Sequence, residues 1–110
     1  MSPLSKSVPT GTEQEPGAKV VKARVGMPVQ IRLWEDRTRG EIWVPNYDAA
    51  VIPLMGDDFL RTASNNAVDQ GQRSFEFKPV AAGTYRLVFE KRMGWKFTAE
   101  DRQIFYVIAS

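Results

Sequence analysis

Cysteine and histidine are both absent from this sequence of 110 residues. Without cysteine, the chain can form no disulfide, no thiolate metal site and no cysteine nucleophile. Histidine is the usual general base near neutral pH and a common zinc ligand, so its absence excludes Ser–His pairs and ordinary zinc sites. We therefore expect no catalytic residue, no metal site and no cofactor.

Carboxylate pairs are the remaining candidates for catalysis, at Asp57-Asp58 and Glu100-Asp101. Adjacent residues on a strand point to opposite faces, so neither pair would converge on one substrate atom. Carboxylate catalysis also needs groups that meet in a cleft and have tuned pKa values. We expect that the chain is not an enzyme.

Long apolar runs are absent too. No stretch approaches the roughly 20 residues of a transmembrane helix, so we expect no membrane partner. The first seventeen residues contain no apolar segment typical of a signal peptide. The compartment stays open: periplasmic or secreted if a signal has been removed, and cytoplasmic otherwise.

An excess of charge of one sign is also missing, because 15 basic residues are set against 13 acidic ones. Nucleic-acid-binding proteins usually gather their basic residues on one face or stripe. Here the arginines are scattered, with acidic residues between them. We expect no nucleic-acid partner and a monomer in solution.

The chain divides into a tail and one domain. Residues 1–17 contain three prolines and almost no large apolar side chains, a composition that cannot offset the entropy cost of ordering. We predict a flexible tail there. Residues 18–110 have the length of one ordinary domain, and the sequence is 43% hydrophobic, enough for a core without disulfides.

Apolar and polar residues alternate with a period of two over most of the domain, which is typical of strands with one face on a core. The alternating segments are residues 21–25, 29–33, 74–78 and 84–90. Residues 104–108 are apolar on both faces, which predicts a central strand. The break at residues 81–83 predicts a tight connection between antiparallel neighbours.

These short strands predict an all-β fold, an immunoglobulin-like antiparallel β-sandwich of six to eight strands, preceded by a disordered N-terminal tail. Residues 56–71 resist assignment because they are polar and rich in small side chains. We predict a long loop there, with a short helical turn at residues 57–61. Long loops in compact domains are often functional.

Three parts of the domain resemble the chagasin family of papain-like cysteine peptidase inhibitors. Residues 25–33, followed by a polar loop that ends at Gly40 and then Trp43, are similar to the family's second and third strands. Residues 81–85 resemble its Ala-Gly-Thr hairpin, and residues 102–108 resemble its last strand. The resemblance spans nearly the whole domain and implies the family's β-sandwich.

The resemblance implies a reversible, tight-binding inhibitor whose partner is a papain-like cysteine peptidase. In the family, three loops at one end of the sandwich enter the active-site cleft of such an enzyme. The corresponding loops lie at residues 36–40, 68–71 and 92–95. The implied partner-binding residues are Asp36, Arg37, Thr38, Arg39, Gly40, Gln70, Gly71, Arg92, Met93, Gly94 and Trp95.

Thr38, Gly40, Arg92 and Trp95 retain residue types of the family's Asn-Pro-Thr-Thr-Gly and Arg-Pro-Trp loops. The resemblance implies that Thr38 forms the deepest point of the wedge, whereas a turn threonine can also cap its own loop. Gly40 is expected to supply a backbone conformation that other residues avoid. Trp95 is expected to be the energetic hot spot, with packing onto the edge of the sandwich as the alternative.

The other tryptophans and the loop arginines lead to separate expectations. Trp43 lies where immunoglobulin-like sandwiches often bury a tryptophan, so we expect it in the core. Trp34 lies where a strand gives way to the loop, and it either extends the binding surface or covers an edge. Arg37 and Arg39 add positive charge to a loop that is neutral in the family, which suggests a target with an acidic cleft or weaker binding.

Two other functions stay open. An immunoglobulin-like adhesion or assembly module would bind its partner through a sheet edge or face instead of the loop tips. A carbohydrate-binding domain would need Trp34, Trp43 and Tyr47 exposed together as stacking platforms. The positions at which substitutions reduce binding would discriminate between these functions.

Overall fold

The structure is a computed structural model, and it describes residues 17–61, 70–93 and 99–110. These residues form seven strands and one 3₁₀ helix. In chain order the elements are β1 (Lys19–Ala23), β2 (Val29–Asp36), η3 (Arg37–Arg39), β3 (Glu41–Asn46), β4 (Leu54–Arg61), β5 (Gln70–Phe77), β6 (Gly83–Met93) and β7 (Ala99–Ala109). The predicted all-β fold of six to eight strands is confirmed.

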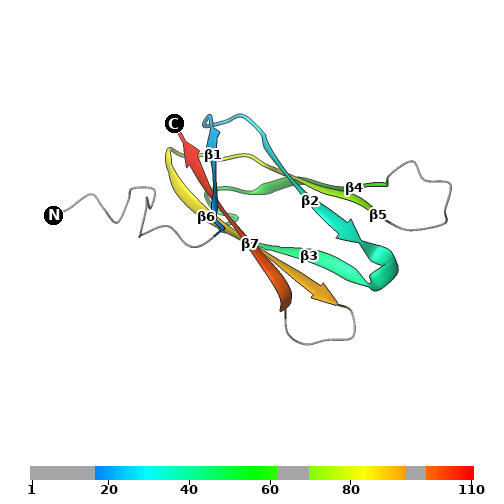
Figure 1. Cartoon of the computed structure of the whole chain (residues 1–110). Coiled ribbons are helices and arrows are strands. Elements are labelled where there is room, and N and C mark those ends of the chain that lie inside the picture. Colours follow the sequence, from blue (N-terminus) through cyan, green and yellow to red (C-terminus); the bar gives the residue numbers. More distant parts are fainter. Residues whose placement is uncertain (1–16, 62–69, 94–98) are drawn as a thin grey trace.

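The strands form two sheets that pack face to face (Figure 1). Sheet A has the strand order β1-β7-β6-β3, and sheet B has the order β2-β5-β4. β1 pairs with β7 in parallel, whereas the other pairs in the described residues are antiparallel. Sheet A is therefore mixed: the sandwich is antiparallel, as predicted, except where β1 joins β7.

The core between the sheets is built from aromatic side chains. Phe89 of β6 is completely buried, and its ring centroid lies 5.0 Å from that of Phe75 and 5.5 Å from that of Phe105. Phe77 also packs on Phe89, at 6.0 Å. Because β5 belongs to sheet B and β6 and β7 to sheet A, these rings join the two sheets directly. The inward positions of the alternating segments supply the core, as the sequence predicts.

β7 lies between β1 and β6 and is the central strand that the sequence predicts. Its alternate residues Phe105 and Val107 face the core, and both are buried. Ile104 and Tyr106, which point to the opposite face of the sheet, are buried as well. A strand covered on both faces explains why this segment has no polar alternation.

β4 corrects one prediction. Residues 57–61 are part of this strand and do not form the predicted helical turn, and residues 62–69 lie outside the described residues. β4 pairs with β5 from Leu54, opposite Phe77, to Arg61, opposite Gly71, with a bulge between Leu54 and Gly56. Residues 57–61 form a strand because their backbone pairs with β5. This pairing is a tertiary contact, and the residues of β4 do not alternate in a way that predicts it.

The prediction for residues 81–83, a tight connection between antiparallel neighbours, is also wrong. β5 and β6 belong to different sheets, so the break between their alternating runs is a crossover and not a hairpin between neighbours. The backbone before it is tied to other loops, since Lys78 N–H donates to Pro53 O at 3.1 Å and Val80 N–H donates to Val51 O at 2.9 Å. Turn residues occur in crossovers as well as in hairpins, so local sequence does not separate the two.

The predicted flexible tail falls almost entirely on residues 1–16, which lie outside the described residues. Gly17 is the first described residue and has a positive φ of 76°. Among the helical residues that the structure describes, none forms a helix of the length and apolarity needed to cross a membrane.

Candidate functional site

Strand register brings three connections to one end of the sandwich. In sheet B, Asp36 at the end of β2 lies opposite Gln70 at the start of β5. In sheet A, Glu41 at the start of β3 lies opposite Met93 at the end of β6. The β2–β3 connection joins the two sheets at this same end, and the strand ends around residues 62–69 and 94–98 lie beside it (Figure 1). We call this region the loop end.

The β2–β3 connection is the 3₁₀ helix η3, and it is capped at both ends. The Asp36 side chain is the N-cap and accepts a hydrogen bond from Thr38 N–H at 3.1 Å. The Thr38 hydroxyl donates to the same carboxylate oxygen. Gly40 has φ 78° and ψ 16°, and its N–H donates to Arg37 O at 3.0 Å. The conformational role expected of Gly40 is therefore present, and the Thr38 hydroxyl caps its own turn in the unbound chain.

Glu35 lies directly below η3 and has no exposed side-chain surface. Its Oε1 accepts a hydrogen bond from Arg37 Nε at 2.8 Å. Its Oε2 accepts one from Trp43 N–H at 2.7 Å and one from Arg73 at 2.8 Å. A buried carboxylate is tolerated only when it is paired and hydrogen-bonded, and Glu35 meets both conditions.

Glu41 is the corresponding carboxylate on the other side of η3, and it is 6% exposed. Its Oε1 accepts a hydrogen bond from Asp36 N–H at 3.2 Å. Its Oε2 lies 3.6 Å from the Arg39 guanidinium and 3.8 Å from Lys91 Nζ. The positive charges that the sequence places in this loop are thus matched by carboxylates of the same chain.

Arg73 extends the network into β5. Its guanidinium donates two hydrogen bonds to the Asp57 carboxylate, at 2.5 and 2.8 Å, as well as the one to Glu35. The hydrogen bond with Asp57, aided by the charges of both carboxylates, raises the pKa of Arg73 above its ordinary value. The Arg37 guanidinium lies 3.9 Å from the centre of the Phe59 ring, which holds it against β4.

Sequence reasoning missed Glu41 and Arg73, did not assign Glu35 to the site, and considered Asp57 only as half of a carboxylate pair for catalysis. A signal was present. Glu35 continues the inward series of Ile31 and Leu33, and Arg73 continues that of Phe77 and Phe75. A charge at an inward position of a strand points to an ion pair at the edge of the core.

Two of the predicted contact residues are placed differently by the structure. Gly71 lies within β5 and is buried, so its assignment to a loop tip is wrong. A Cβ at this position would overlap with the Leu60 carbonyl oxygen and lie 2.8 Å from Arg61 Cα, so glycine is needed for strand contact. Met93 is 7% exposed and packs inward, because it occupies an inward position at the end of β6. Both positions are covered, so neither offers a contact to a partner in this arrangement.

The other predicted residues lie at the loop end or outside the described residues. Arg92 is exposed at the end of β6, and its guanidinium donates to Glu90 at 2.6 Å. This hydrogen bond lowers the pKa of Glu90, with a further contribution from Arg102. The backbone of Gln70 begins β5. Gly94 and Trp95 lie outside the described residues.

The tryptophans decide against the carbohydrate hypothesis. Trp43 is 4% exposed and belongs to the core, as predicted, and its indole N–H donates to Trp34 O at 2.7 Å. Trp34 is 49% exposed on the outer side of β2. Tyr47 packs edge-on against Phe77 at 5.2 Å. The three rings are not exposed together, so they form no common stacking platform.

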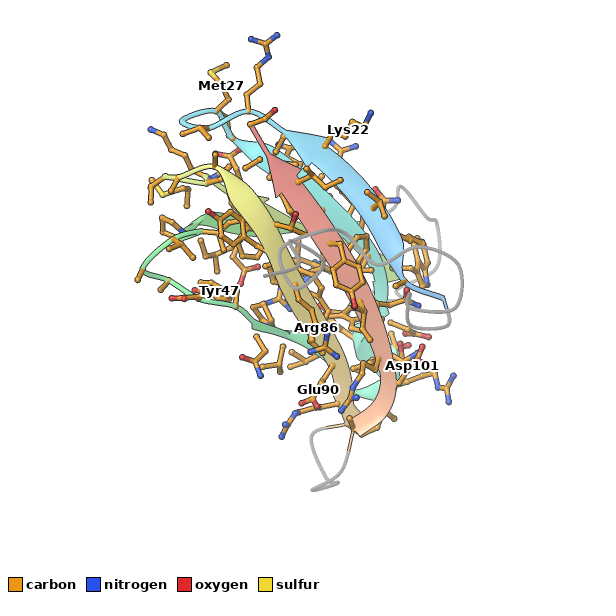
Figure 2. All side chains as sticks on the ribbon, turned by 90° about the vertical axis from the view of Figure 1, so that its left-hand side faces the viewer. Lys22, Met27, Tyr47, Arg86, Glu90 and Asp101 are labelled. Atoms are coloured by element: carbon orange, nitrogen blue, oxygen red, sulfur yellow. The ribbon has the colours of Figure 1, made fainter. Side chains whose placement is uncertain are left out.

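Two open hollows on the described surface lie away from η3. One is lined by Lys22, Met27 and their neighbours, and another by Tyr47, Arg86 and their neighbours. Figure 2 shows Lys22 and Met27 at the end opposite to Glu90 and Asp101. Within the described residues there is no cluster of acidic side chains that could hold a metal ion.

Three solved structures share the fold of this chain, and one of them is named as an inhibitor. EhICP2, the cysteine protease inhibitor from Entamoeba histolytica, has a TM-score of 0.67 and 15% identity, over 84% of this chain and 96% of that chain. Amebosin has a TM-score of 0.66 and 14% identity, over 87% of this chain and all of that chain (100%). PbICP-C, solved in complex with falcipain-2, has a TM-score of 0.63 and 14% identity, over 84% of this chain and 89% of that chain. At such identities the likeness shows the fold alone.

The sequence itself provides the family assignment. No curated protein sequence matches this chain. The family model described as chagasin family peptidase inhibitor I42 matches residues 22–109, which run from β1 to the end of β7. The chain therefore belongs to the chagasin family of peptidase inhibitors.

Proposed function

We propose that this protein is a reversible, tight-binding inhibitor of papain-like cysteine peptidases, which it blocks by placing the loop end in the active-site cleft. Membership of the chagasin family is the observation that carries the proposal. The convergence of three strand connections at one end supports it. A protein of the same fold, PbICP-C, has been solved in complex with falcipain-2.

The central connection supplies the wedge that enters the cleft. It comprises Asp36, Arg37, Thr38, Arg39 and Gly40. Arg39 is the most exposed of the charged side chains described there, at 68%, whereas Arg37 is held against Glu35 and Phe59. The wedge therefore presents backbone, Thr38 and Arg39 to the target.

The flanking connections supply the outer contacts. Gln70 lies beside one of them, and Arg92, Gly94 and Trp95 belong to the other. Gly71 and Met93 are removed from the set of direct contacts, since both are buried. An interface of standard size, about 1,600 Å² in total, is within reach of one end of such a sandwich.

The proposed action needs no chemistry from the inhibitor. A wedge on two packed sheets loses little conformational entropy when it docks, which favours high affinity. Occupation of the cleft excludes the substrate, so binding alone accounts for inhibition. We propose accordingly that the chain is not an enzyme.

The first test is the residual activity of papain and a cathepsin-L-like enzyme, titrated with the purified protein at low and high salt. Stoichiometric, reversible loss of activity with the inhibitor left uncleaved supports the proposal. Slower association at high salt would support a role for the loop arginines in attracting an acidic cleft. No inhibition at micromolar protein would contradict the proposal and favour an immunoglobulin-like binding module.

The substitution Trp95→Ala tests the expected hot spot within the same titration. We expect a loss of about 2 kcal/mol or more, which is about thirtyfold in affinity. Trp34→Ala, at an exposed tryptophan outside the three loops, shows in the same titration whether the binding surface extends along β2. An unchanged inhibition constant for folded Trp95→Ala would contradict this role for Trp95.

A further inference from the structure

The two legs of the η3 wedge belong to different sheets. β2 lies in sheet B and β3 in sheet A, and no backbone ladder joins β2 to β3 in the described part of the chain. A wedge of this kind lacks the hydrogen bonds that hold an ordinary hairpin together. Something else must fix the angle and spacing of its legs.

Two buried carboxylates connect the legs in a crossed arrangement. Glu35 on β2 accepts a hydrogen bond from the backbone N–H of Trp43 on β3, at 2.7 Å. Glu41 on β3 accepts one from the backbone N–H of Asp36 on β2, at 3.2 Å. Each leg therefore supplies a side-chain acceptor to the backbone of the other. We call this pair of contacts the cross-brace.

The remaining partners of the cross-brace anchor the wedge to the sheets beneath it. Glu35 also bonds Arg37 within η3 and Arg73 in β5. Glu41 also faces Arg39 within η3 and Lys91 in β6. Each carboxylate thus joins one arginine of the wedge to one cation on a strand of its own sheet.

Stability alone is a weak reason for such an arrangement. Buried ion pairs often contribute less to folding than apolar side chains of similar volume, because desolvation of the charges offsets their attraction. Their better-attested use is to specify one geometry among several. Here the charges gather at the feet of the connection that enters the target, while the middle of the core is aromatic.

We propose that Glu35 and Glu41 are positioning residues for inhibition, which hold η3 in the conformation that docks. The inference rests on the proposed function. Neither carboxylate touches the target: Glu35 is fully covered and Glu41 nearly so. Loss of the cross-brace lowers the fraction of molecules with a competent wedge, and the apparent affinity falls by the same factor.

The test compares Glu35→Gln and Glu41→Gln with Glu76→Gln in the full chain. Glu76 is a control carboxylate on β5, opposite Gln30 and far along the strand from the loop end. Association and dissociation rates with a cathepsin-L-like enzyme are measured at a temperature where circular dichroism shows each variant to be folded. Amide hydrogen exchange of residues 36–43 is measured on the free proteins.

We expect about tenfold slower association for each brace variant, little change in dissociation, and faster exchange at the amide of Trp43 or Asp36. Glu76→Gln should match the wild type in all three measurements. Association and exchange that are unchanged in a folded brace variant would overturn the proposal. If Glu35→Gln fails to fold, Glu41→Gln carries the test, because the cations facing its second oxygen are partly exposed.

Failure of the proposed function gives a different result. If the wild type inhibits no papain-like enzyme, the inhibitor assignment fails, and the exchange data on the free variants still report on the cross-brace. Faster exchange confined to residues 36–43 would show that the carboxylates order the wedge. Unchanged exchange would overturn the cross-brace as well.

Discussion

The middle of the sandwich and its loop end are built on the same strands but are held together by different interactions. In the middle, Phe75, Phe77, Phe89 and Phe105 pack across the two sheets. At the loop end, two residues further along the same inward faces, the contacts are ion pairs centred on Glu35.

The two kinds of interaction have different effects: one stabilises the fold, and the other fixes the geometry of the loop end. Apolar packing is non-directional, so it stabilises the fold without fixing any single loop. Charged hydrogen bonds have strict geometry, so they fix the positions of the groups they join. Substitutions of the core aromatic residues should therefore change stability, and substitutions of the charged residues at the loop end should change binding at similar stability.

The substitution Phe89→Ala should give the largest effect. The side chain is fully buried and contacts aromatic rings of both sheets, so its loss should cost about 3–5 kcal/mol of unfolding free energy. Urea denaturation measures the loss. The inhibition constant per folded molecule should stay near that of the wild type. A large change in it would contradict the assignment of stability to the core and of binding to the loop end.

Gly71→Ala should come next, with a loss of about 1–3 kcal/mol, because the added methyl meets the backbone of β4. Gly56→Ala, on the partner strand, is the matched control. Its Cβ would lie 3.5 Å from Glu76 Cβ, an ordinary contact, so little change is expected. Equal thermal midpoints for the two variants would show that the close approach of β4 at Gly71 is not needed.

Asp36→Ala probes the loop end. The change removes the N-cap of η3 and should cost about 1 kcal/mol or less of stability. Because the cap orders Thr38, the loss of binding free energy should exceed the loss of unfolding free energy. Paired measurements of the inhibition constant and the unfolding free energy check this ordering, and a loss of stability with unchanged inhibition would contradict it.

Glu90→Gln should give the smallest effect, visible only in acid. The folded-state pKa of Glu90 is lowered from 4.5, chiefly by its hydrogen bond with Arg92. A lowered pKa contributes stability above the unfolded-state value, and this contribution disappears as the pH falls through the folded-state value. The wild type should therefore lose slightly more stability than Glu90→Gln between about pH 5 and pH 3. Thermal midpoints over this pH range measure the difference, and parallel curves would argue against the pairing.

Much of the fold was readable from the alternation of residues. The inward positions of β2, β5 and β6 followed from it. The central place of β7 followed from its apolar run, and the burial of Trp43 from its likeness to immunoglobulin-like sandwiches. β4 did not, because its Gly56-Asp57-Asp58 segment has no alternation and is a strand only through its partner. The parallel pairing of β1 likewise depends on a distant strand: Lys19 lies opposite Phe105, which is 86 residues further along the chain.

The loop end was readable only in part. Residue types pointed to the η3 wedge and to Gly40, whose φ of 78° matches the expectation. They also assigned Gly71 and Met93 to the contact surface, where the structure has a buried strand residue and a buried side chain. Resemblance between loops aligns positions along the chain, and it does not show which side chains face the solvent.

The sequence by itself determined the fold class and the faces that form the core, because period-two alternation is a property of neighbouring residues. It also gave the family, through its resemblance to the chagasin sequences. Only the tertiary structure decided that Glu35 meets Arg73, 38 residues away, and that the carboxylates of two different sheets cross beneath η3. Those contacts depend on strand register and sheet packing, which bring together groups that no local pattern connects.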